Sequence, residues 1–168
     1  MKKFENFENF RTFTFFKMGD QSFVISVSLK SGCYRHIQIS GEATLEDLSS
    51  FILEAFKFDN DHLHAFFMDN KIYSPDNCYY SKGSEEKTTN TSQIKLNQLE
   101  LTKGKKFKYL FDFGESWEFQ CNILSVLNEK TDAPKIVKTK GEAPSQYGGF
   151  EEEDEEEEKE KDQKNPKK

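Results

Sequence analysis

The sequence predicts an α+β domain in which a mostly antiparallel, β-grasp-like sheet packs on one principal helix. Three observations support this fold class. Hydrophobic residues alternate with polar ones in several short stretches, as in strands with one buried face. One stretch instead has apolar residues at helical spacing, and turn-forming residues separate the stretches. The expected order is strand, strand, helix, strand, strand, long loop, strand and strand, which is typical of the α+β class.

The first half of the chain supplies a hairpin and the helix. Residues 23–29 and 34–40 alternate as strands, and a short Ser-Gly turn joins them. Thr44 is suited to be the N-cap of a helix, and Asp47 follows three residues later, as in a capping box. Apolar residues then recur at helical spacing, so we expect the helix to end near Phe58.

The middle of the chain predicts two shorter strands and a loop. Residues 62–68 have the pattern of a strand, and residues 71–73 that of a short one. Residues 76–92 are rich in Asn, Ser, Thr, Lys and Glu, which predicts a long exposed loop. Residues 94–101 are expected to form a short helix or turn, and residues 128–150 to be irregular.

The stretch from Tyr109 to Phe119 is the most informative in the chain. Aromatic residues occupy every second position up to Phe113, Gly114 interrupts the pattern, and the pattern restarts at Trp117, the single tryptophan. This predicts two strands joined by a turn. We expect Trp117 to anchor the core and Gly114 to hold a backbone conformation that is costly for other residues.

Length and composition favour a single soluble domain. The 168 residues include 17 Phe, 6 Tyr and one Trp, enough for a compact aromatic-rich core. The three cysteines are odd in number and far apart, so no disulfide framework is expected, which fits a reducing cytoplasm. No window approaches the roughly 18 apolar residues of a membrane helix. We therefore expect a cytoplasmic protein without membrane association.

The two ends of the chain differ from the single domain expected over residues 19–150. Residues 1–18 carry Phe at every third position, a spacing that suits neither a strand nor a long helix, and we expect a poorly ordered leader. Met18 is a candidate second start. Residues 151–168 open with eight consecutive acidic residues and contain no aromatic residue, which predicts a disordered tail.

Charge is concentrated in that tail. The formal net charge is −6, of which residues 151–168 contribute −5 and residues 1–150 only −1. A nearly neutral body offers no general attraction to nucleic-acid phosphates or to anionic lipid.

Four segments carry a family resemblance. They are the strand that contains Arg35, the Phe-Asp and His-Leu-His run at residues 58–66, the Asp-Phe-Gly-Glu-Ser-Trp-Glu run within residues 106–118, and Pro144 followed by a Gly-Gly pair. In this order and spacing they resemble the plasmid pRiA4b ORF-3-like family, whose members are also described as passenger proteins of insertion elements. The resemblance covers residues 20–150. It implies an α+β fold and an association with mobile elements, and it supplies no established catalytic activity.

Two departures from the family's pattern bear on function. Phe119 stands where relatives often have His, and Tyr34 stands where they often have Trp. A metal-binding or proton-transfer role of a histidine at position 119 is therefore not expected in this chain.

Two groups of residues are candidates for a site. His62 and His64 are two apart on an expected strand, so both imidazoles would face one side and could approach a metal, or could simply pack and bond to the backbone. Asp112, Glu115 and Glu118 form an acidic cluster around the expected turn. These carboxylates could serve acid–base chemistry, but a turn-capping Asp112 beside two solvated glutamates is the simpler interpretation. We expect no metal, no cofactor and no catalysis.

The sequence favours a binding module as the function. The expected mechanism is recognition of an unidentified protein partner through a sheet surface or edge around Tyr109 and Trp117. The alternative is an accessory nucleic-acid-binding protein, in which Arg35 and the lysines of residues 103–108 contact phosphates and the neighbouring tyrosine stacks on a base. The near-neutral body and the acidic tail weigh against that alternative.

Overall fold

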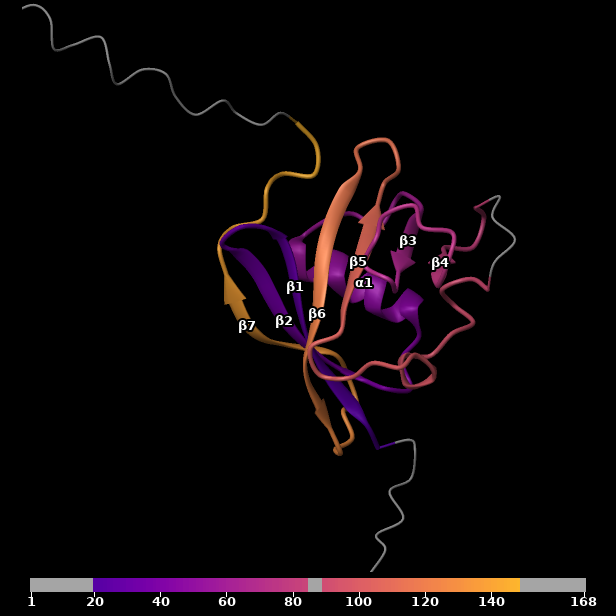
Figure 1. Ribbon diagram of the computed structural model, residues 1–168. Coiled ribbons are helices and arrows are strands. Elements are labelled where there is room, and N and C mark those ends of the chain that lie inside the picture. Colours follow the sequence, from indigo (N-terminus) through magenta and orange to yellow (C-terminus); the bar gives the residue numbers. More distant parts are fainter. Residues whose placement is uncertain (1–19, 85–88, 149–168) are drawn as a thin grey trace, which may run out of the picture.

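The computed structural model describes residues 20–84 and 89–148, and these residues form a seven-stranded sheet with one α-helix (Figure 1). The strand order is β4-β3-β5-β6-β1-β2-β7, and every neighbouring pair is antiparallel. The leader and the tail predicted for residues 1–18 and 151–168 lie outside the described residues. Within the described residues, no helix is both long and apolar enough to cross a membrane. The elements are β1 (Ser22–Lys30), β2 (Cys33–Ser40), α1 (Leu45–Phe56), β3 (His64–Phe67), β4 (Cys78–Tyr80), the short 3-10 helix η1 (Leu96–Gln98), β5 (Lys106–Phe111), β6 (Trp117–Leu127) and β7 (Lys135–Lys140).

Local chemistry sets both ends of α1. The Thr44 hydroxyl accepts a hydrogen bond from the backbone N–H of Asp47 (3.1 Å), and the Asp47 carboxylate accepts one from the N–H of Thr44 (2.8 Å). The predicted capping box is therefore confirmed. The helix ends at Phe56, because Lys57 takes a left-handed conformation with φ 60°.

Alternation along the strands gives the sheet one buried face. Odd-numbered residues of β1, β5 and β6, such as Phe23, Phe107 and Phe119, are buried in one cluster with the apolar residues of α1. Aromatic rings pack edge to face there, as Phe56 of the helix does on Phe119 with ring centroids 5.1 Å apart. This packing places α1 behind the sheet in Figure 1, and the mostly antiparallel sheet of the prediction is confirmed.

The even-numbered residues of β1, β2, β5 and most of β6, and the odd-numbered residues of β3, point to the opposite face. The described residues cover this face only at one end. There Ala65, Phe67 and Leu110 form a second small core with the partly buried Tyr80 and Phe113. Across β1, β2 and β6, the same face carries mostly polar side chains. This polar face is turned toward the viewer in Figure 1.

Several local predictions differ from the structure. Residues 71–73 form a turn rather than a strand, and β4 and β7 arise in stretches predicted to be loop or irregular. β3 is shorter than the strand predicted for residues 62–68. At the β5–β6 turn the residues with positive φ are Asp112 (57°) and Ser116 (53°), and Gly114 is not among them. The prediction that Gly114 holds a costly conformation is therefore wrong.

Candidate functional site

Three segments that are far apart in the sequence meet beyond the end of α1. His62 lies beside the β5–β6 turn, because the backbone N–H of Asp112 donates to the carbonyl of Leu63 (3.0 Å). Nδ1 of His62 is 2.7 Å from Oδ1 of Asp61, and its Nε2 is 3.6 Å from Oδ2 of Asp112. The other carboxylate oxygen of Asp61 accepts a hydrogen bond from the Tyr147 hydroxyl. We call these four side chains, Asp61, His62, Asp112 and Tyr147, the His62 cluster.

Gln146, which precedes Tyr147, hydrogen-bonds to the segment that follows α1. Its side-chain carbonyl accepts a hydrogen bond from the N–H of Asp59 (2.5 Å), and its amide donates to the carbonyl of the same residue (3.1 Å). One side chain thus satisfies both backbone groups of Asp59. The pair holds the segment that bears Tyr147 against the segment that bears His62.

Neighbouring charges and hydrogen bonds shift the pKa of Asp61, His62 and Tyr147. The hydrogen bond with Asp61 raises the pKa of His62 above its ordinary value, and the Asp112 and Glu115 carboxylates add to this effect. The hydrogen bond from Tyr147 is the main cause that lowers the pKa of Asp61. The same bond raises the pKa of Tyr147 to about 12. Asp61, His62 and Tyr147 are exposed and Asp112 is buried, and His62 keeps its proton to a higher pH than an ordinary histidine does.

Asp112 builds the turn that carries the other acidic residues. Its Oδ1 accepts hydrogen bonds from two backbone N–H groups of the turn, at 2.9 and 3.3 Å, so the turn-capping interpretation describes its contacts. Glu115 and Glu118 are exposed. Trp117 is only half-buried and packs edge-on against Phe58 at the margin of the core, with ring centroids 4.9 Å apart. It is therefore not the central core residue that the sequence predicted.

Arg35 has a structural role, because it is buried and hydrogen-bonds to backbone carbonyls of two other elements. It is 6% exposed, its Nε donates to the carbonyl of Ala55 at the end of α1 (3.1 Å), and its Nη1 donates to the carbonyls of Lys140 and Gly141 at the end of β7 (both 3.0 Å). The guanidinium also lies over the ring of Phe56, 4.8 Å from its centroid. The alternative function used Arg35 as a phosphate contact, but carbonyl groups and burial already occupy the guanidinium.

His64 and Tyr109 are buried as well. Nε2 of His64 lies 3.1 Å from the Thr91 hydroxyl and 3.4 Å from a Glu46 carboxylate oxygen, and burial lowers the pKa of this histidine. Tyr109 is fully buried, and its hydroxyl shares a 2.7 Å hydrogen bond with Ser49. The two histidines therefore have separate partners, and His64 packs against Phe66 with ring centroids 6.0 Å apart. Tyr109, a candidate binding residue of the sequence, offers no surface to a partner.

Metal-ligating side chains are dispersed through the fold. Structural zinc sites place four Cys or His ligands around one ion. Cys33 and Cys121 are instead buried thiols in the sheet. Among residues 20–84 and 89–148, no group of three His, Cys, Asp or Glu side chains is placed to hold a metal ion.

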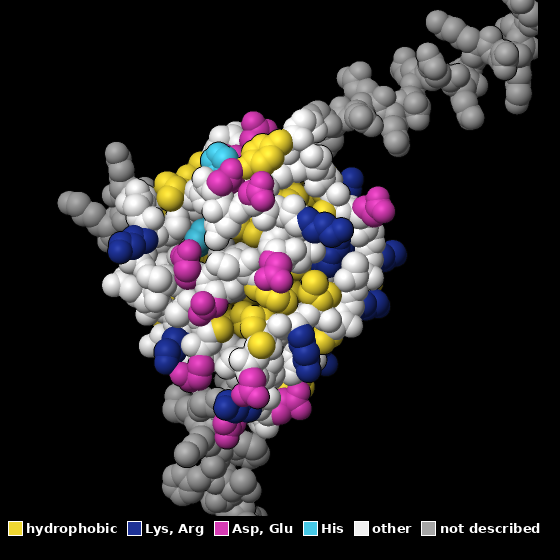
Figure 2. Space-filling model, turned by 180° about the vertical axis from the view of Figure 1, so that it is seen from behind, with side chains coloured by type: hydrophobic (Ala, Val, Ile, Leu, Met, Phe, Trp, Pro, Cys, Tyr) yellow, Lys and Arg dark blue, Asp and Glu magenta, His cyan; other side chains and the backbone are white. Residues whose placement is uncertain are grey.

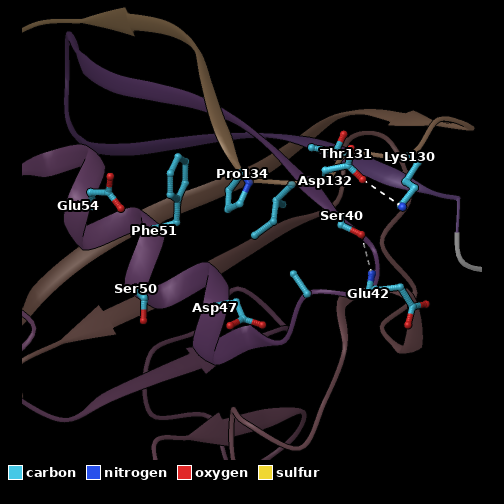
Figure 3. Close-up of a pocket in the computed structure, with 12 residues that line it drawn as sticks. Ser40, Glu42, Asp47, Ser50, Phe51, Glu54, Lys130, Thr131, Asp132 and Pro134 are labelled. Atoms are coloured by element: carbon cyan, nitrogen blue, oxygen red, sulfur yellow. Dashed lines mark hydrogen bonds and ion pairs between the residues drawn. The ribbon is translucent and has the colours of Figure 1, made fainter.

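A groove between α1 and β7 adjoins the His62 cluster. Its first part is a cleft of about 720 Å³, with Lys57 and Asp59 on the helix side, Ile136 and Thr139 of β7 opposite them, and Tyr147 at its end. Its second part has a volume of about 590 Å³ and lies along the preceding turns of α1, toward the loop before β7 (Figure 3). We call the two parts together the α1–β7 groove.

The second part of the groove has an apolar floor and an acidic rim. In Figure 3, Phe51 and Glu54 project from α1, and Pro134 lies opposite, near the ion pair of Lys130 with Asp132 (3.1 Å). Phe51 and Pro134 supply apolar surface. The acidic residues along the two parts of the groove are Glu42, Asp47, Glu54, Asp132, Asp59 and Glu142.

Figure 2 shows this side of the molecule. Hydrophobic side chains gather near the middle of the face, acidic side chains lie among and beside them, and lysines gather toward one edge. Ile136 and Val137 of β7 are 44% and 48% exposed. Exposed apolar side chains beside a groove are typical of surfaces that bind a partner.

Sequence reasoning missed β7 and, with it, the groove. Residues 135–140 contain β-branched side chains, which is a strand signal, but Pro134 before them and Gly141 after them favoured irregular structure. Tyr147 was missed for a different reason. Its role depends on contact with Asp61, which no local pattern indicates.

The comparisons with known proteins agree with this description. No curated protein matches the chain. A crystal structure of a protein of unknown function, MM3350 from Methanosarcina mazei Go1, is similar with a TM-score of 0.61 and 21% sequence identity, and the match covers 75% of this chain and 72% of that chain. At this identity the likeness shows the fold alone. The profile of the family described as plasmid pRiA4b ORF-3-like protein matches residues 21–168. The chain therefore belongs to the plasmid pRiA4b ORF-3-like family.

Proposed function

We propose that this protein is a binding module that takes an extended segment of a partner protein into the α1–β7 groove. The observation that carries the proposal is the position of β7, which is one of the two edge strands of the described sheet and also one wall of the first part of the groove. A strand edge beside a helix offers hydrogen bonds to a peptide backbone and pockets to its alternate side chains. The role requires no catalytic step.

The details of β7 support pairing with an added strand. All six of its residues are exposed. Ile136 and Thr139 line the groove, whereas Lys138 and Lys140 share the opposite face with their partners on β2. A register shift leaves Val137 as an extra residue. The lysines and the bulge of β7 disfavour pairing between two copies of this strand. A strand of different composition can therefore pair with this edge.

The charge along the groove determines which side chains the partner strand is expected to carry. Carboxylates outnumber cationic side chains along the groove. Asp132 is paired with Lys130 and Glu42 with Lys95, so Glu54, Asp59 and Glu142 carry the selective negative charge. Phe51 and Ile136 add apolar contact area. The expected ligand therefore carries basic and aliphatic side chains on the face toward the groove. It carries neutral or acidic side chains on the other face, near the lysines of β7.

The His62 cluster lies at the end of the groove and suits a basic side chain of the same segment. Asp61 and Glu115 supply negative charge there. Protonated His62 opposes a cation, so binding is expected to weaken as the pH falls through the raised pKa of His62.

A titration with labelled peptides tests this function. The probe is a short peptide in which leucine and lysine alternate on one face and threonine and glutamate on the other, and its control has the same residues in scrambled order. Fluorescence anisotropy is expected to show at least about tenfold tighter binding of the ordered peptide. Glu54→Lys and Glu142→Lys are expected to weaken that binding, whereas Glu100→Lys, with the same charge change outside the groove, is expected to leave it unchanged. Equal affinity for the two peptides, or an equal loss in Glu100→Lys, would contradict the proposal.

Family membership supports an association with mobile elements, so we propose a partner that such an element encodes or encounters. A cytoplasmic location fits that setting and the buried thiols. The β-grasp-like description rests on the order of the elements and stays a proposal about the fold.

A further inference from the structure

The polar face of the sheet, on the side opposite to α1, carries a second surface. Two rows of side chains cross β7, β2, β1, β6 and β5 in register. Neither row contains an acidic residue, and a lysine stands at each end of both. Along β6 the nearest acidic residue is Glu118, two positions from Gln120. One row is Lys140, Tyr34, Ser28, Gln120 and Lys108, and the other is Lys138, His36, Ser26, Asn122 and Lys106.

An aromatic pair lies within these rows. The rings of Tyr34 and His36 are stacked, with centroids 4.9 Å apart and 20° between their planes. Nζ of Lys138 is 5.7 Å from the centroid of the Tyr34 ring. Burial, and then the charge of Lys138, lower the pKa of His36, so its imidazole is neutral at neutral pH. Both rings are half-buried, which holds them in place while part of each stays accessible.

We propose that this polar face binds single-stranded nucleic acid. Neighbouring strands lie about 4.8 Å apart, so the lysines at the two ends of a row are separated by roughly 19 Å. Aromatic rings on a sheet stack on unpaired bases, and flanking lysines hold the backbone phosphates. The half-buried hydroxyls of Ser26 and Ser28 between them supply hydrogen-bond donors and acceptors to base edges, whereas the side-chain amide of Gln120 already donates to Asn70 and to the carbonyl of Phe107. A duplex keeps its bases stacked inside, so the single strand is the better ligand.

The exposed residues of this face differ in part from those of the nucleic-acid site expected from the sequence. Arg35 is buried, but Tyr34 and His36 beside it face outward, because side chains alternate along a strand. Lys106 and Lys108 belong to the basic stretch predicted for phosphate contact, and β7 adds two lysines. The rows and the α1–β7 groove use opposite faces of β7, so this inference stands independently of the proposed peptide site.

Anisotropy of a fluorescein-labelled oligothymidine, measured with the full-length protein over a salt series, tests the proposal. We expect binding at low salt, a slope of log affinity against log salt of about −0.7 per phosphate contact, and weaker binding of a duplex of equal length. The double variant Lys138→Gln/Lys140→Gln is expected to reduce both affinity and slope. Tyr34→Ala is expected to lower affinity roughly tenfold at an unchanged slope, through lost stacking.

The matched control is Lys57→Gln/Lys130→Gln, which removes the same charge from the groove side of the molecule and is expected to bind as the wild type does. The melting temperature of each variant is to be measured to check that it is folded. The lysines of β7 are exposed, so their substitution is expected not to disturb the core. The proposal is overturned if oligothymidine does not bind at low salt. It is also overturned if the duplex binds as tightly, or if the control double variant loses as much affinity as Lys138→Gln/Lys140→Gln.

Discussion

The turn between β5 and β6 places two residues other than glycine in the left-handed region, Asp112 at φ 57° and Ser116 at φ 53°. Aspartate tolerates this conformation better than alanine does, because its short side chain hydrogen-bonds to the nearby backbone. Asp112→Ala is therefore predicted to lower the free energy of unfolding by roughly 1–3 kcal/mol, through lost hydrogen bonds and added strain. Urea denaturation measures the change.

Gly114→Ala is the matched variant in the same turn. Its φ is not left-handed, and an added Cβ would meet only Oδ1 of Asp112, at 3.3 Å. The change in the free energy of unfolding is expected to stay within about 1 kcal/mol. A larger loss from Gly114→Ala than from Asp112→Ala would contradict this description of the turn.

The two histidines of the His-Leu-His run are predicted to act on stability with opposite signs. The pKa of His64 is lowered by burial, so its contribution is present above its ordinary value of 6.5 and is lost as the pH falls through its folded pKa. The pKa of His62 is raised, so its contribution is present below 6.5 and is lost as the pH rises through its folded pKa.

Urea unfolding between about pH 7.5 and 5.5 compares the two. Relative to the wild type, His64→Gln is expected to lose less stability as the pH falls, and His62→Gln to lose more. Comparing slopes with pH separates this effect from any general loss that a substitution causes. Equal slopes in both variants would show that the two environments do not differ as described.

At the scale of elements, Arg35 joins β2 to the end of α1 and to the end of β7. A lysine has one ammonium group and cannot reach carbonyls on two elements with the fixed fork of a guanidinium. Arg35→Lys is therefore predicted to lower the free energy of unfolding by roughly 2–4 kcal/mol, measured by chemical denaturation. Lys30→Gln, an exposed change at the end of β1, is the control. A loss in Arg35→Lys as small as in that control would mean that the guanidinium does not hold the elements together.

Elements with a complete local pattern were predictable from the sequence. A few neighbouring residues are enough to predict each of these elements. They are β1 and β2 from their alternation, α1 from its Thr44 cap, and β5 from its aromatic run. β7 was missed because all six of its residues are exposed, so no buried side chains mark one of its faces. β4 was missed because three residues are too few to show alternation.

The candidate site was predictable only in part, for the same kind of reason. His62 and Asp112 stand in motifs and could be named from the sequence, but the partner hydroxyl of Tyr147 comes from a distant segment. Arg35 and Tyr109 carry polar groups that suggested a surface. Their burial depends on the way α1 and β7 pack, which the sequence does not state locally.

At the scale of the whole molecule, different charges predominate on two surfaces. The α1–β7 groove is rimmed by carboxylates, and the polar face carries lysines. Residues 151–168 add −5 to the net charge and repel nucleic acid through long-range electrostatics. Deleting residues 151–168 is predicted to tighten oligothymidine binding at low salt, with a smaller gain at high salt because salt screens the repulsion.

The control for that deletion keeps the length and replaces residues 151–158, all acidic, by glutamine and asparagine. Both forms are expected to gain affinity, because charge and not length is responsible. If the neutralised form binds oligothymidine only as tightly as the wild type does, the charge of residues 151–158 is not the cause of the repulsion.

The central claim is that an extended partner segment pairs with β7. Residue-by-residue amide hydrogen exchange, measured by NMR with and without the ordered leucine–lysine peptide, tests it most directly. β4 lies at the other edge of the sheet and serves as an internal control for nonspecific strand pairing. We predict that exchange slows for outward-facing amides within residues 135–140 and stays unchanged in β4. Slower exchange in β4 alone, or unchanged exchange in β7 at a saturating peptide concentration, would contradict the account.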